Sequence, residues 1–315
     1  MASRRGRSAL MVLMLFLGTA AACAARTLDV PGEYASIAAA LVAAVAGDEV
    51  VIAPGSYSES LVVTAAITIR GSGPDCTAVL LGSANAEVSA VTVVLPAAGD
   101  VRFETLSLAA PGSADCIEVD GSPDGVVTVT NCAFHVGPES VGIAVQSGSL
   151  VVDSSVFRGP DAALQALGSS CGVLVGLGAS AAIRNCDFAY FADAIQTLGG
   201  ANLAVEACNI RYSTVGIAIR NQFSDSTTAQ LGVNQIYGCS VGIAIAGATT
   251  FVMVEGNTIS DCSRAPFRVS VGACFGADLG APFSGTLFGA GNVVPQLELL
   301  CPDEDSGFWP AGFFE

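Results

Sequence analysis

Seven polar and aromatic residues in the middle of the chain have side chains suited to a carbohydrate site. Arginine donates several hydrogen bonds to hydroxyl and carboxylate oxygens, and tyrosine rings can stack on sugars. The residues are Arg158, Asp161, Tyr190, Asp193, Arg211, Tyr212 and Arg220. Within this set, Asp161, Asp193 and Arg211 are the candidates for catalysis, because they could act as acid, base or electrostatic groups. Each residue also has a plainer interpretation as a solvated loop residue.

A short phrase, apolar-x-polar-x-x-apolar, recurs six times and predicts how these residues are placed. The phrases are VTNCAF, VDSSVF, IRNCDF, VEACNI, LGVNQI and VEGNTI, all between residues 129 and 259. Their fourth positions are separated by steps of 23, 31, 22, 26 and 23 residues and are Cys132, Ser155, Cys186, Cys208, Asn234 and Asn257. A repeat of this length is one turn of a solenoid, which buries its apolar face only against its neighbours.

A second segment, Gly-apolar-x-apolar or a close variant, follows five of the phrases. It lies at 141–145, 171–175, 193–197, 215–219 and 241–245. Apolar residues alternate with a period of two and no helix-period stretch intervenes, so each turn should consist of short strands. Equivalent residues of successive turns should then form columns with a spacing of about 4.8 Å. The predicted interior column contains Phe134, Phe157, Phe188 and Ile210.

These repeats, together with the segments at 30–63 and 67–73, resemble the right-handed parallel β-helix proteins of the pectin lyase-like superfamily. The resemblance implies an all-β fold, a single-stranded right-handed parallel β-helix whose N-terminal end is closed by a short capping helix at 34–45. It also implies a tight turn at the fourth position of the phrase. There Asn234 and Asn257 would tolerate left-handed backbone and bond to their stacked equivalents. Lyases, hydrolases, adhesins and proteins without known activity share this fold, which leaves the function open.

The N-terminus has the pattern of a secretory signal, since three arginines precede an apolar run at 9–17. We therefore divide the chain into a removed signal peptide at 1–25, a β-helix with its cap at 26–300 and a C-terminal tail at 301–315. We expect export to the extracellular space or periplasm. Lipidation at Cys23, with attachment to a membrane, is the alternative, although a lipobox usually has Leu where this chain has Ala20.

The tail carries four aromatic residues, which would form an exposed apolar patch unless the tail docked as a C-terminal cap. These residues are Phe308, Trp309, Phe313 and Phe314.

The charge of the chain narrows its range of partners. The formal charge is -16, and all 12 cations are arginine. Without the signal peptide, 9 basic residues face 28 acidic ones. A nucleic-acid partner is excluded, because neutralising phosphates requires a basic surface. We expect a monomer without a cofactor.

Ten cysteines remain after Cys23, an even number in a compartment that permits disulfides. Three pairings are predicted from the repeat and from the C-terminal spacing, namely Cys239 with Cys262, Cys186 with Cys208, and Cys274 with Cys301. For Cys186 and Cys208, a reduced ladder of stacked thiols is the alternative. A metal site is not expected, because no Cys-x-x-Cys occurs and the single histidine, His135, has no partner at metal-binding spacing.

The resemblance places a catalytic cleft on the outer face of the sheet that carries the Gly-apolar-x-apolar segments. The predicted outward residues are Ala144, Gln146, Leu174, Gly176, Gln196, Leu198, Ala218, Arg220, Ala244, Ala246, Arg268 and Ser270. None is a carboxylate, Lys or His, so this face should lack an acid–base pair. On another face, Asp153, Arg184 and Glu206 occupy one outward position in successive turns and should form a salt-bridge ladder.

Known enzyme motifs of the superfamily are missing. The paired Asp motifs, Gly-His-Gly and Arg-x-Lys of polygalacturonase-like proteins do not occur, and Arg264 and Arg268 are one residue too close for the Arg-x-Pro-x-x-Arg of pectate-lyase-like proteins. Three hypotheses remain. The chain is an exported, non-catalytic β-helix that presents a surface for polysaccharide or another envelope component, a divergent polysaccharide lyase or glycoside hydrolase, or a structural, adhesin-like envelope module.

Overall fold

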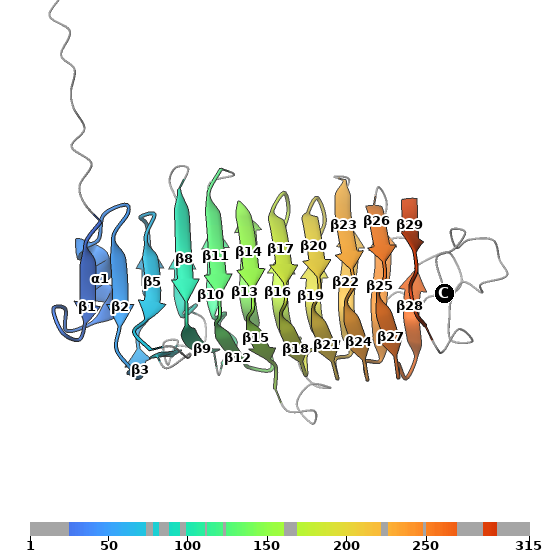
Figure 1. Ribbon diagram of the computed structural model, residues 1–315, viewed down its shortest axis with the longest axis horizontal. Helices are drawn as coiled ribbons and strands as arrows, with labels where there is room; N and C mark the ends of the chain where they lie inside the picture. The colour runs from blue at the N-terminus through green and yellow to red at the C-terminus, as the bar shows by residue number, and fades with distance from the viewer. Residues whose placement is uncertain are drawn as a thin grey trace, which may run out of the picture.

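The computed structural model describes residues 25–73, 78–81, 88–94, 99–110, 112–121, 124–160, 169–221, 226–247, 250–269 and 286–294. Within these ranges the chain winds into a coil of three parallel sheets, here called sheets A, B and C (Figure 1). Each turn passes from sheet A to sheet B to sheet C and lies on the turn before it. The predicted all-β parallel β-helix is confirmed.

Nearly every turn contributes one strand to each sheet. Sheet A has 11 strands: β1 (Thr27–Val30), β2 (Glu49–Ile52), β5 (Thr68–Gly71), β8 (Asp100–Glu104), β11 (Val126–Thr130), β14 (Ser149–Asp153), β17 (Ser180–Arg184), β20 (Asn202–Glu206), β23 (Thr227–Gly232), β26 (Thr250–Glu255) and β29 (Thr286–Ala290). Sheet B has nine: β3 (Gly55–Ser58), β6 (Ala78–Leu81), β9 (Leu106–Ala110), β12 (Ala133–Val136), β15 (Val156–Arg158), β18 (Asp187–Ala189), β21 (Asn209–Arg211), β24 (Gln235–Tyr237) and β27 (Thr258–Ser260). Sheet C has nine: β4 (Leu61–Val63), β7 (Val91–Val93), β10 (Ile117–Asp120), β13 (Val141–Ser147), β16 (Cys171–Val175), β19 (Asp193–Thr197), β22 (Val215–Asn221), β25 (Val241–Gly247) and β28 (Ala265–Val269).

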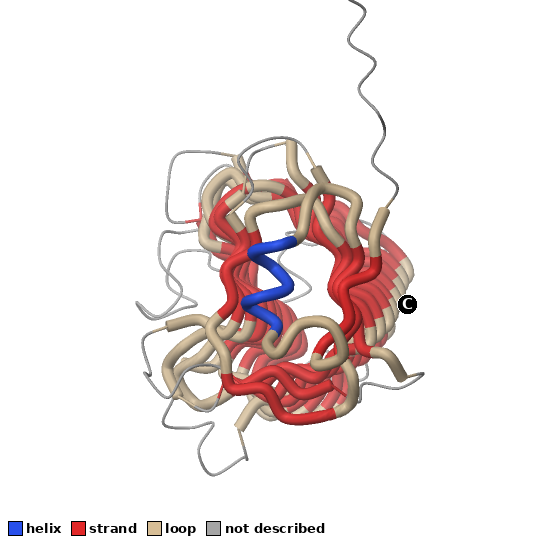
Figure 2. The backbone as a smooth tube through the Cα atoms, turned by 90° about the vertical axis from the view of Figure 1, so that its left-hand side faces the viewer, coloured by secondary structure: helices blue, strands red, loops and turns tan. Residues whose placement is uncertain are grey.

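The capping helix α1 (Ile37–Ala43) lies across the N-terminal end of the coil (Figure 2). It is shorter than the expected 34–45. Ser36 is its N-cap and accepts a hydrogen bond from the Ala39 amide at 3.1 Å, while the Glu59 carboxylate accepts from the Ile37 amide at 3.2 Å. These bonds satisfy amides that have no partner within the helix. Ile37 and Ala40 are buried and close the apolar interior.

The predicted interior column is confirmed. Phe134, Phe157 and Phe188 are paired in register and fully buried, with ring centroids 4.4 and 4.5 Å apart and nearly parallel planes. Ile210 continues the column in the next turn. The coil therefore repeats one interior contact along its axis, and its stability depends on keeping these side chains in register.

The turn between sheets A and B differs from the expected one by a single residue. The left-handed residue is the third of the phrase, with φ between 50° and 62° at Asn131, Ser154, Asn185, Ala207, Val233 and Gly256. The expectation that Asn234 and Asn257 take this conformation is therefore wrong. The third position is exposed to solvent, whereas the fourth points into the coil and is buried. The side chain of Asn thus serves as a hydrogen-bonding group here.

Buried asparagines form a short ladder across the last described turns of the coil. Asn257 Oδ1 accepts from the backbone amide and Nδ2 of Asn234 at 3.0 and 2.9 Å, and Asn292 Oδ1 accepts from the same two groups of Asn257 at 3.1 Å. In an earlier turn the acceptor is a serine hydroxyl: Ser155 Oγ accepts a hydrogen bond from the Cys132 amide at 3.1 Å. The ladder is discontinuous, as expected from the cysteines and serine in this column.

Two of the three predicted disulfides, Cys186 with Cys208 and Cys239 with Cys262, are not formed, which corrects the prediction for these pairs. Cys186, Cys208, Cys239 and Cys262 are all buried thiols. Side chains in register on parallel strands are about 4.8 Å apart, which exceeds the mean Cβ separation of about 3.8 Å in a disulfide. A hydrogen bond to Cys208, together with burial, raises the pKa of Cys186, and burial raises the pKa of Cys239 to about 11. The reduced ladder, which was the alternative for Cys186 and Cys208, is the arrangement present.

Several predictions concern residues outside the described ranges. They are residues 1–24 of the predicted signal peptide at 1–25, with Cys23 among them, and Asp161, Ser270, the Cys274 and Cys301 pair and the aromatic tail at 301–315. In the part that is described, no helix is long and apolar enough to cross a membrane.

A partly buried ion pair joins Arg26, the residue before β1, to the loop before β2. Asp48, whose side chain is 1% exposed, accepts from Arg26 Nε at 3.1 Å and from the Val45 amide at 2.9 Å. The Arg26 hydrogen bond is the main cause of a pKa for Asp48 well below its usual value. A depressed carboxyl pKa stabilises the folded state at any pH above the unfolded pKa of about 3.9.

Removal of this charge should loosen the cap in a pH-dependent way. We expect Asp48→Asn to lower the thermal midpoint by a constant amount from pH 8 to about pH 5, and the difference from wild type should shrink as the pH falls below about 4. Thermal unfolding of both proteins across this range measures the effect. Asp100→Asn is the matched control, because Asp100 is 55% exposed in a 3.8 Å pair with Arg102 and should contribute almost nothing. A pH-independent difference would contradict the argument.

If the phenylalanine column is the core of the coil, shortening one of its side chains should lower the free energy of unfolding. Phe157→Ala should lower the free energy of unfolding by about 3–5 kcal/mol, because it leaves a cavity between two stacked rings. Urea denaturation measures the loss. The neighbouring Val156→Ala removes an outward side chain that is 37% exposed, and its effect should stay within about 0.5 kcal/mol. Similar losses for the two variants would show that the column is not the core of the coil.

Candidate functional site

Two arginines and an aspartate form a clamp on the outer face of sheet B. Arg158, Asp187 and Arg211 come from β15, β18 and β21, three successive turns. Asp187 Oδ1 lies 3.0 Å from Arg158 Nη1, and Asp187 Oδ2 lies 2.6 Å from Arg211 Nη1. Ala189 lies in register between the two arginines and leaves room for this arrangement. One carboxylate thereby holds two guanidinium groups in place.

Three tyrosines lie beside the clamp. The rings of Tyr190 and Tyr212 are stacked with centroids 5.6 Å apart, and Tyr237 meets Tyr212 edge-on, also at 5.6 Å. Tyr190 and Tyr212 have left-handed backbone in equivalent turns. In the next turn Gly238 takes this place, and a Cβ there would lie only 2.7 Å from the Tyr212 ring. The ring of Tyr212 therefore requires glycine at this position.

These six residues form one surface, here called the arginine–tyrosine surface, made of Arg158, Asp187, Tyr190, Arg211, Tyr212 and Tyr237. Burial acts against the charge of Arg211, but Asp187 and Tyr237 outweigh it and raise the pKa of Arg211. Tyr212 is 45% exposed. The surface combines two fixed cations with an accessible aromatic face in a chain of net charge -16.

A small hollow of about 220 Å³ continues this surface toward the N-terminus. It lies over β9, β12 and β15, with His135 and Arg158 among its lining residues. His135 is exposed and is paired in register with Arg158.

A second polar group lies on the outer face of sheet C. Asp193, the first residue of β19, pairs with Arg220 of β22 at 3.0 Å. Gln196 lies between them. In the amide orientation that satisfies both neighbours, its nitrogen donates to Asp193 Oδ2 at 3.1 Å and its oxygen accepts from Arg220 Nη1 at 2.9 Å. Burial raises the pKa of Asp193, and the charge of Arg220 opposes this shift. The pair is 13% and 20% exposed, so each charge is largely neutralised by the other.

Two further carboxylates lie near the N-terminal end of the same face. Glu118 belongs to β10 and accepts a hydrogen bond from Ser89 Oγ at 3.2 Å, while Asp115 precedes β10 and accepts from the Val141 amide at 2.9 Å. Burial is the main cause of a raised pKa for Asp115, and the charge of Glu118 adds to it. The prediction that this face has no carboxylate is therefore wrong, because Glu118 and Asp193 both lie on its strands.

Farther along sheet C the outer face is apolar and covered. Five small residues form a cluster separate from the interior, each at most 9% exposed, namely Val215, Ala218, Val241, Ala244 and Ala246. They carry no titratable group. Acid–base chemistry on the described part of this face would therefore depend on the turns that hold Asp115, Glu118 and Asp193.

Six of the seven predicted site residues are described, and they fall into two groups. Arg158, Tyr190, Arg211 and Tyr212 lie together on the arginine–tyrosine surface, Asp193 and Arg220 form the ion pair on sheet C, and Asp161 is outside the described residues. The catalytic candidates Asp193 and Arg211 do not meet, because each is bound to a different partner. Their strands belong to different sheets of the coil.

Sequence reasoning missed the residue on which the clamp depends. Asp187 is the fifth residue of the phrase IRNCDF, an outward position, and its equivalents in adjacent turns are followed two residues later by Arg158 and Arg211. This register could be read from the repeat, and it would have placed Asp187 beside the two arginines. Asp115 and Glu118 were missed because they lie one turn before the first phrase counted as a repeat.

The predicted charge ladder on sheet A is only half formed. Arg184 and Glu206 make an ion pair at 3.4 Å, as expected. Asp153 is in register with Arg184 but instead accepts a hydrogen bond from Asn185 Nδ2 at 2.8 Å. Among the described residues, no group of three or more His, Cys, Asp or Glu is arranged to hold a metal ion.

Parallel strands, three-sided turns and stacked interior columns define this chain as a parallel β-solenoid. A family model described as "Right handed beta helix region" matches residues 115–275, just over half of the chain. The chain therefore belongs to this family, which confirms the resemblance inferred from the repeats.

The chain also matches solved structures at low sequence identity. One is an alginate lyase from Paenibacillus sp. str. FPU-7, with 14% identity, a TM-score of 0.47, and coverage of 84% of this chain and 99% of the other. Another is a pectin methyl esterase from rice weevil, with 14% identity, a TM-score of 0.49, and coverage of 84% and 87%. A comparison with curated proteins found no match.

Proposed function

We propose that this chain is an exported, non-catalytic β-helix that binds acidic polysaccharide through the arginine–tyrosine surface. The observation that carries the proposal is the clamp, in which Asp187 holds Arg158 and Arg211 through one nitrogen each. Both guanidinium groups keep further N–H donors, and arginine binds carboxylate and sulfate groups well because its donors form a fixed fork. Export rests on the basic and apolar N-terminal segment described above.

The clamp favours binding because it reduces the cost of ordering long side chains. A free arginine loses rotamer freedom when it binds a ligand, but these two are already held by Asp187. Their backbones are two turns of the coil apart, about 10 Å. Their Nη1 atoms are closer together, because both contact the carboxylate of Asp187, so the two cations together could bind one uronate carboxylate or two adjacent ones. The exposed ring of Tyr212 offers an apolar face for a sugar ring between or beside them.

Binding should depend on Arg211 and on the charge of the ligand. We expect Arg211→Ala to weaken the binding of an oligouronate about ten- to hundredfold, the effect of losing hydrogen bonds to a charged group. Calorimetric titration with the oligouronate and with its uncharged methyl ester measures both dependences. Asp187 keeps Arg158 as a partner in this variant, so the fold should be retained.

Arg102→Ala is the control, because Arg102 is an exposed arginine of sheet A paired with an aspartate at 3.8 Å. It should bind the oligouronate like wild type. Equal binding by the Arg211 variant, or equal affinity for the acid and its methyl ester, would refute the proposed role of the clamp.

A second candidate function, cleavage of polysaccharide, is favoured by Asp115 and Glu118. They lie in one turn on the outer face of sheet C, and the raised pKa of Asp115 keeps its carboxyl protonated to higher pH than usual. Two carboxyl groups in different environments are the kind of pair that general acid and base catalysis uses.

If the chain is an enzyme of this kind, Asp115→Asn should lower the rate of product release at least about a hundredfold and leave oligouronate affinity unchanged. Activity of the wild type should decline as the pH rises through the raised pKa of Asp115, because the acid form is lost. Reducing-end and unsaturated-product assays on purified protein test this. Absence of product from both acidic and neutral polysaccharides would exclude catalysis in favour of binding alone.

A further inference from the structure

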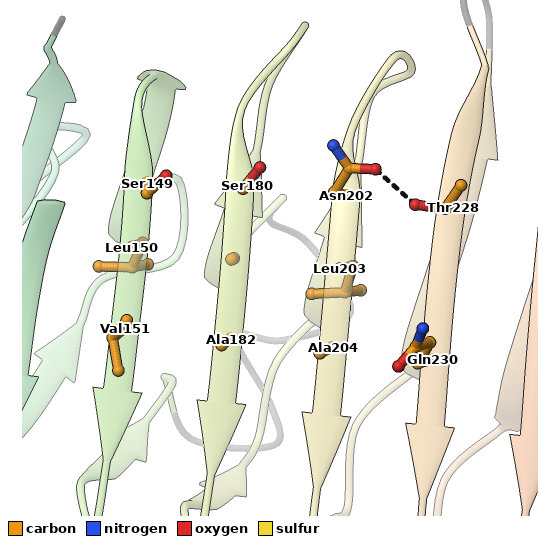
Figure 3. Close-up of a pocket in the computed structure, with 11 residues that line it drawn as sticks. Ser149, Leu150, Val151, Ser180, Ala182, Asn202, Leu203, Ala204, Thr228 and Gln230 are labelled. Carbon is orange, nitrogen blue, oxygen red and sulfur yellow. Dashed lines mark hydrogen bonds between the residues drawn. The ribbon is translucent and has the colours of Figure 1, made fainter. Parts of the chain in front are cut away.

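A shallow trough runs along the outer face of sheet A, away from both groups described above. It has a volume of about 450 Å³ and crosses β14, β17, β20 and β23 (Figure 3). Its outward residues, here called the sheet A trough, are Ser149, Val151, Ser180, Ala182, Asn202, Ala204, Thr228 and Gln230. A second hollow of about 230 Å³ shares Ala204 and Gln230 and extends to β26. Together they form one groove along the coil axis.

The groove exists because small side chains occupy one outward row in successive turns. Val151, Ala182 and Ala204 are in register along its floor. Arg184 and Glu206, joined at 3.4 Å, lie in the parallel row beside it. At the C-terminal end, the larger side chains of Phe251 and Met253 are 46% and 37% exposed. The floor is therefore bordered by charged side chains on one side and apolar ones at the end.

The other row of the trough consists of neutral hydrogen-bonding groups. Ser149, Ser180, Asn202 and Thr228 are in register. Thr228 Oγ1 donates a hydrogen bond to Asn202 Oδ1, and the Asn202 Nδ2 group points away from Thr228 (Figure 3). The hydroxyls and the Gln230 amide can donate or accept. Such groups suit sugar hydroxyls, whereas an ionised ligand would find no countercharge in these two rows.

The spacing of the trough distinguishes a glycan from a peptide. Each turn presents equivalent groups about 4.8 Å farther along the axis, which is close to the length of one hexose unit in an extended chain. A peptide strand advances about 3.3 Å per residue and would lose register within two turns. The two rows of the trough contain no cation, and the whole chain has a net charge of -16. Both features disfavour an anionic polymer here.

We propose that the sheet A trough binds an uncharged, extended oligosaccharide parallel to the coil axis. Sugar rings lie over Ala182 and Ala204, hydroxyls bond to Ser180, Asn202, Thr228 and Gln230, and Phe251 offers a ring for stacking at the end. This proposal does not rest on the arginine–tyrosine surface, which lies on sheet B. If both hold, one chain connects an acidic glycan to a neutral one.

Substitutions in the trough test the proposal with neutral hexasaccharides of glucose, mannose and xylose as probes. Ala204→Phe fills the floor and should weaken binding of the preferred probe at least tenfold, whereas Asn202→Ala removes neutral hydrogen bonds and should weaken it about two- to tenfold. Affinity in wild type should rise with chain length up to about four units, the number of turns that the trough crosses. Calorimetry measures affinity, and thermal unfolding verifies that each variant is folded.

Thr258→Phe is the matched control, since it adds the same ring at an exposed position of sheet B, and it should bind the probe like wild type. Arg211→Ala should also retain neutral binding, which separates this proposal from the one on acidic glycans. Failure of every neutral probe to bind wild type, or unchanged binding by Ala204→Phe, would overturn the proposal. So would light scattering that shows a wild-type dimer converted to a monomer by Ala204→Phe, because the trough would then be an interface between copies.

Discussion

The structure depends on the in-register stacking of parallel turns. Backbone hydrogen bonds join each strand to its equivalent in the next turn, so equivalent positions of successive turns form rows along the axis. Inside the coil, this stacking aligns Phe134, Phe157 and Phe188 with centroids 4.4 and 4.5 Å apart. A slip of one residue in any strand would turn its interior side chains outward. Interior columns and outer rows therefore have the same cause.

The same stacking lets an acidic chain hold cations at chosen places. Arg158 and Arg211 reach one turn forward and one turn back to share Asp187, and Arg220 reaches back to Asp193. Partly buried ion pairs contribute little net stability, because desolvation offsets most of the Coulomb attraction. Their value here is position, since each arginine is held in a single orientation. The outer faces differ accordingly: sheet B presents fixed cations and tyrosines, sheet A a neutral trough, and sheet C carboxylates beside an apolar cluster.

Much of the fold could be predicted from the sequence, because a solenoid turns a repeat directly into neighbours in space. From residue 129 on, the phrase located strands of sheets A and B with their interior phenylalanines, and the Gly-apolar-x-apolar segment located strands of sheet C. The left-handed residue was misplaced by one because the pattern marks a turn without showing which of its residues faces solvent. Asn234 was read as a conformational residue, whereas it is buried and acts through its side chain.

The sites were less predictable, because they depend on how far side chains reach between turns. The repeat pattern assigns Arg158 and Arg211 to one face of the coil. Whether they bond to Asp187 depends on the lengths and rotamers of the three side chains, which the pattern does not give. Asp193 begins the predicted strand segment at 193–197, but the pattern does not show that its side chain meets Arg220 of the next turn. Cysteines in register were expected to bridge, yet Cys186 and Cys208 are thiols joined by a hydrogen bond. Asp161 lies in the longest step of the repeat, where no periodic pattern can locate it.

Some turns are separated by short steps of 22 and 23 residues. A tandem duplication of such a segment would insert one complete turn and leave the other turns undisturbed, since each turn contacts only its neighbours. Both outer surfaces would grow by the same increment. Avidity for a polymeric ligand could therefore evolve by genetic lengthening alone, with no new residue required at either surface.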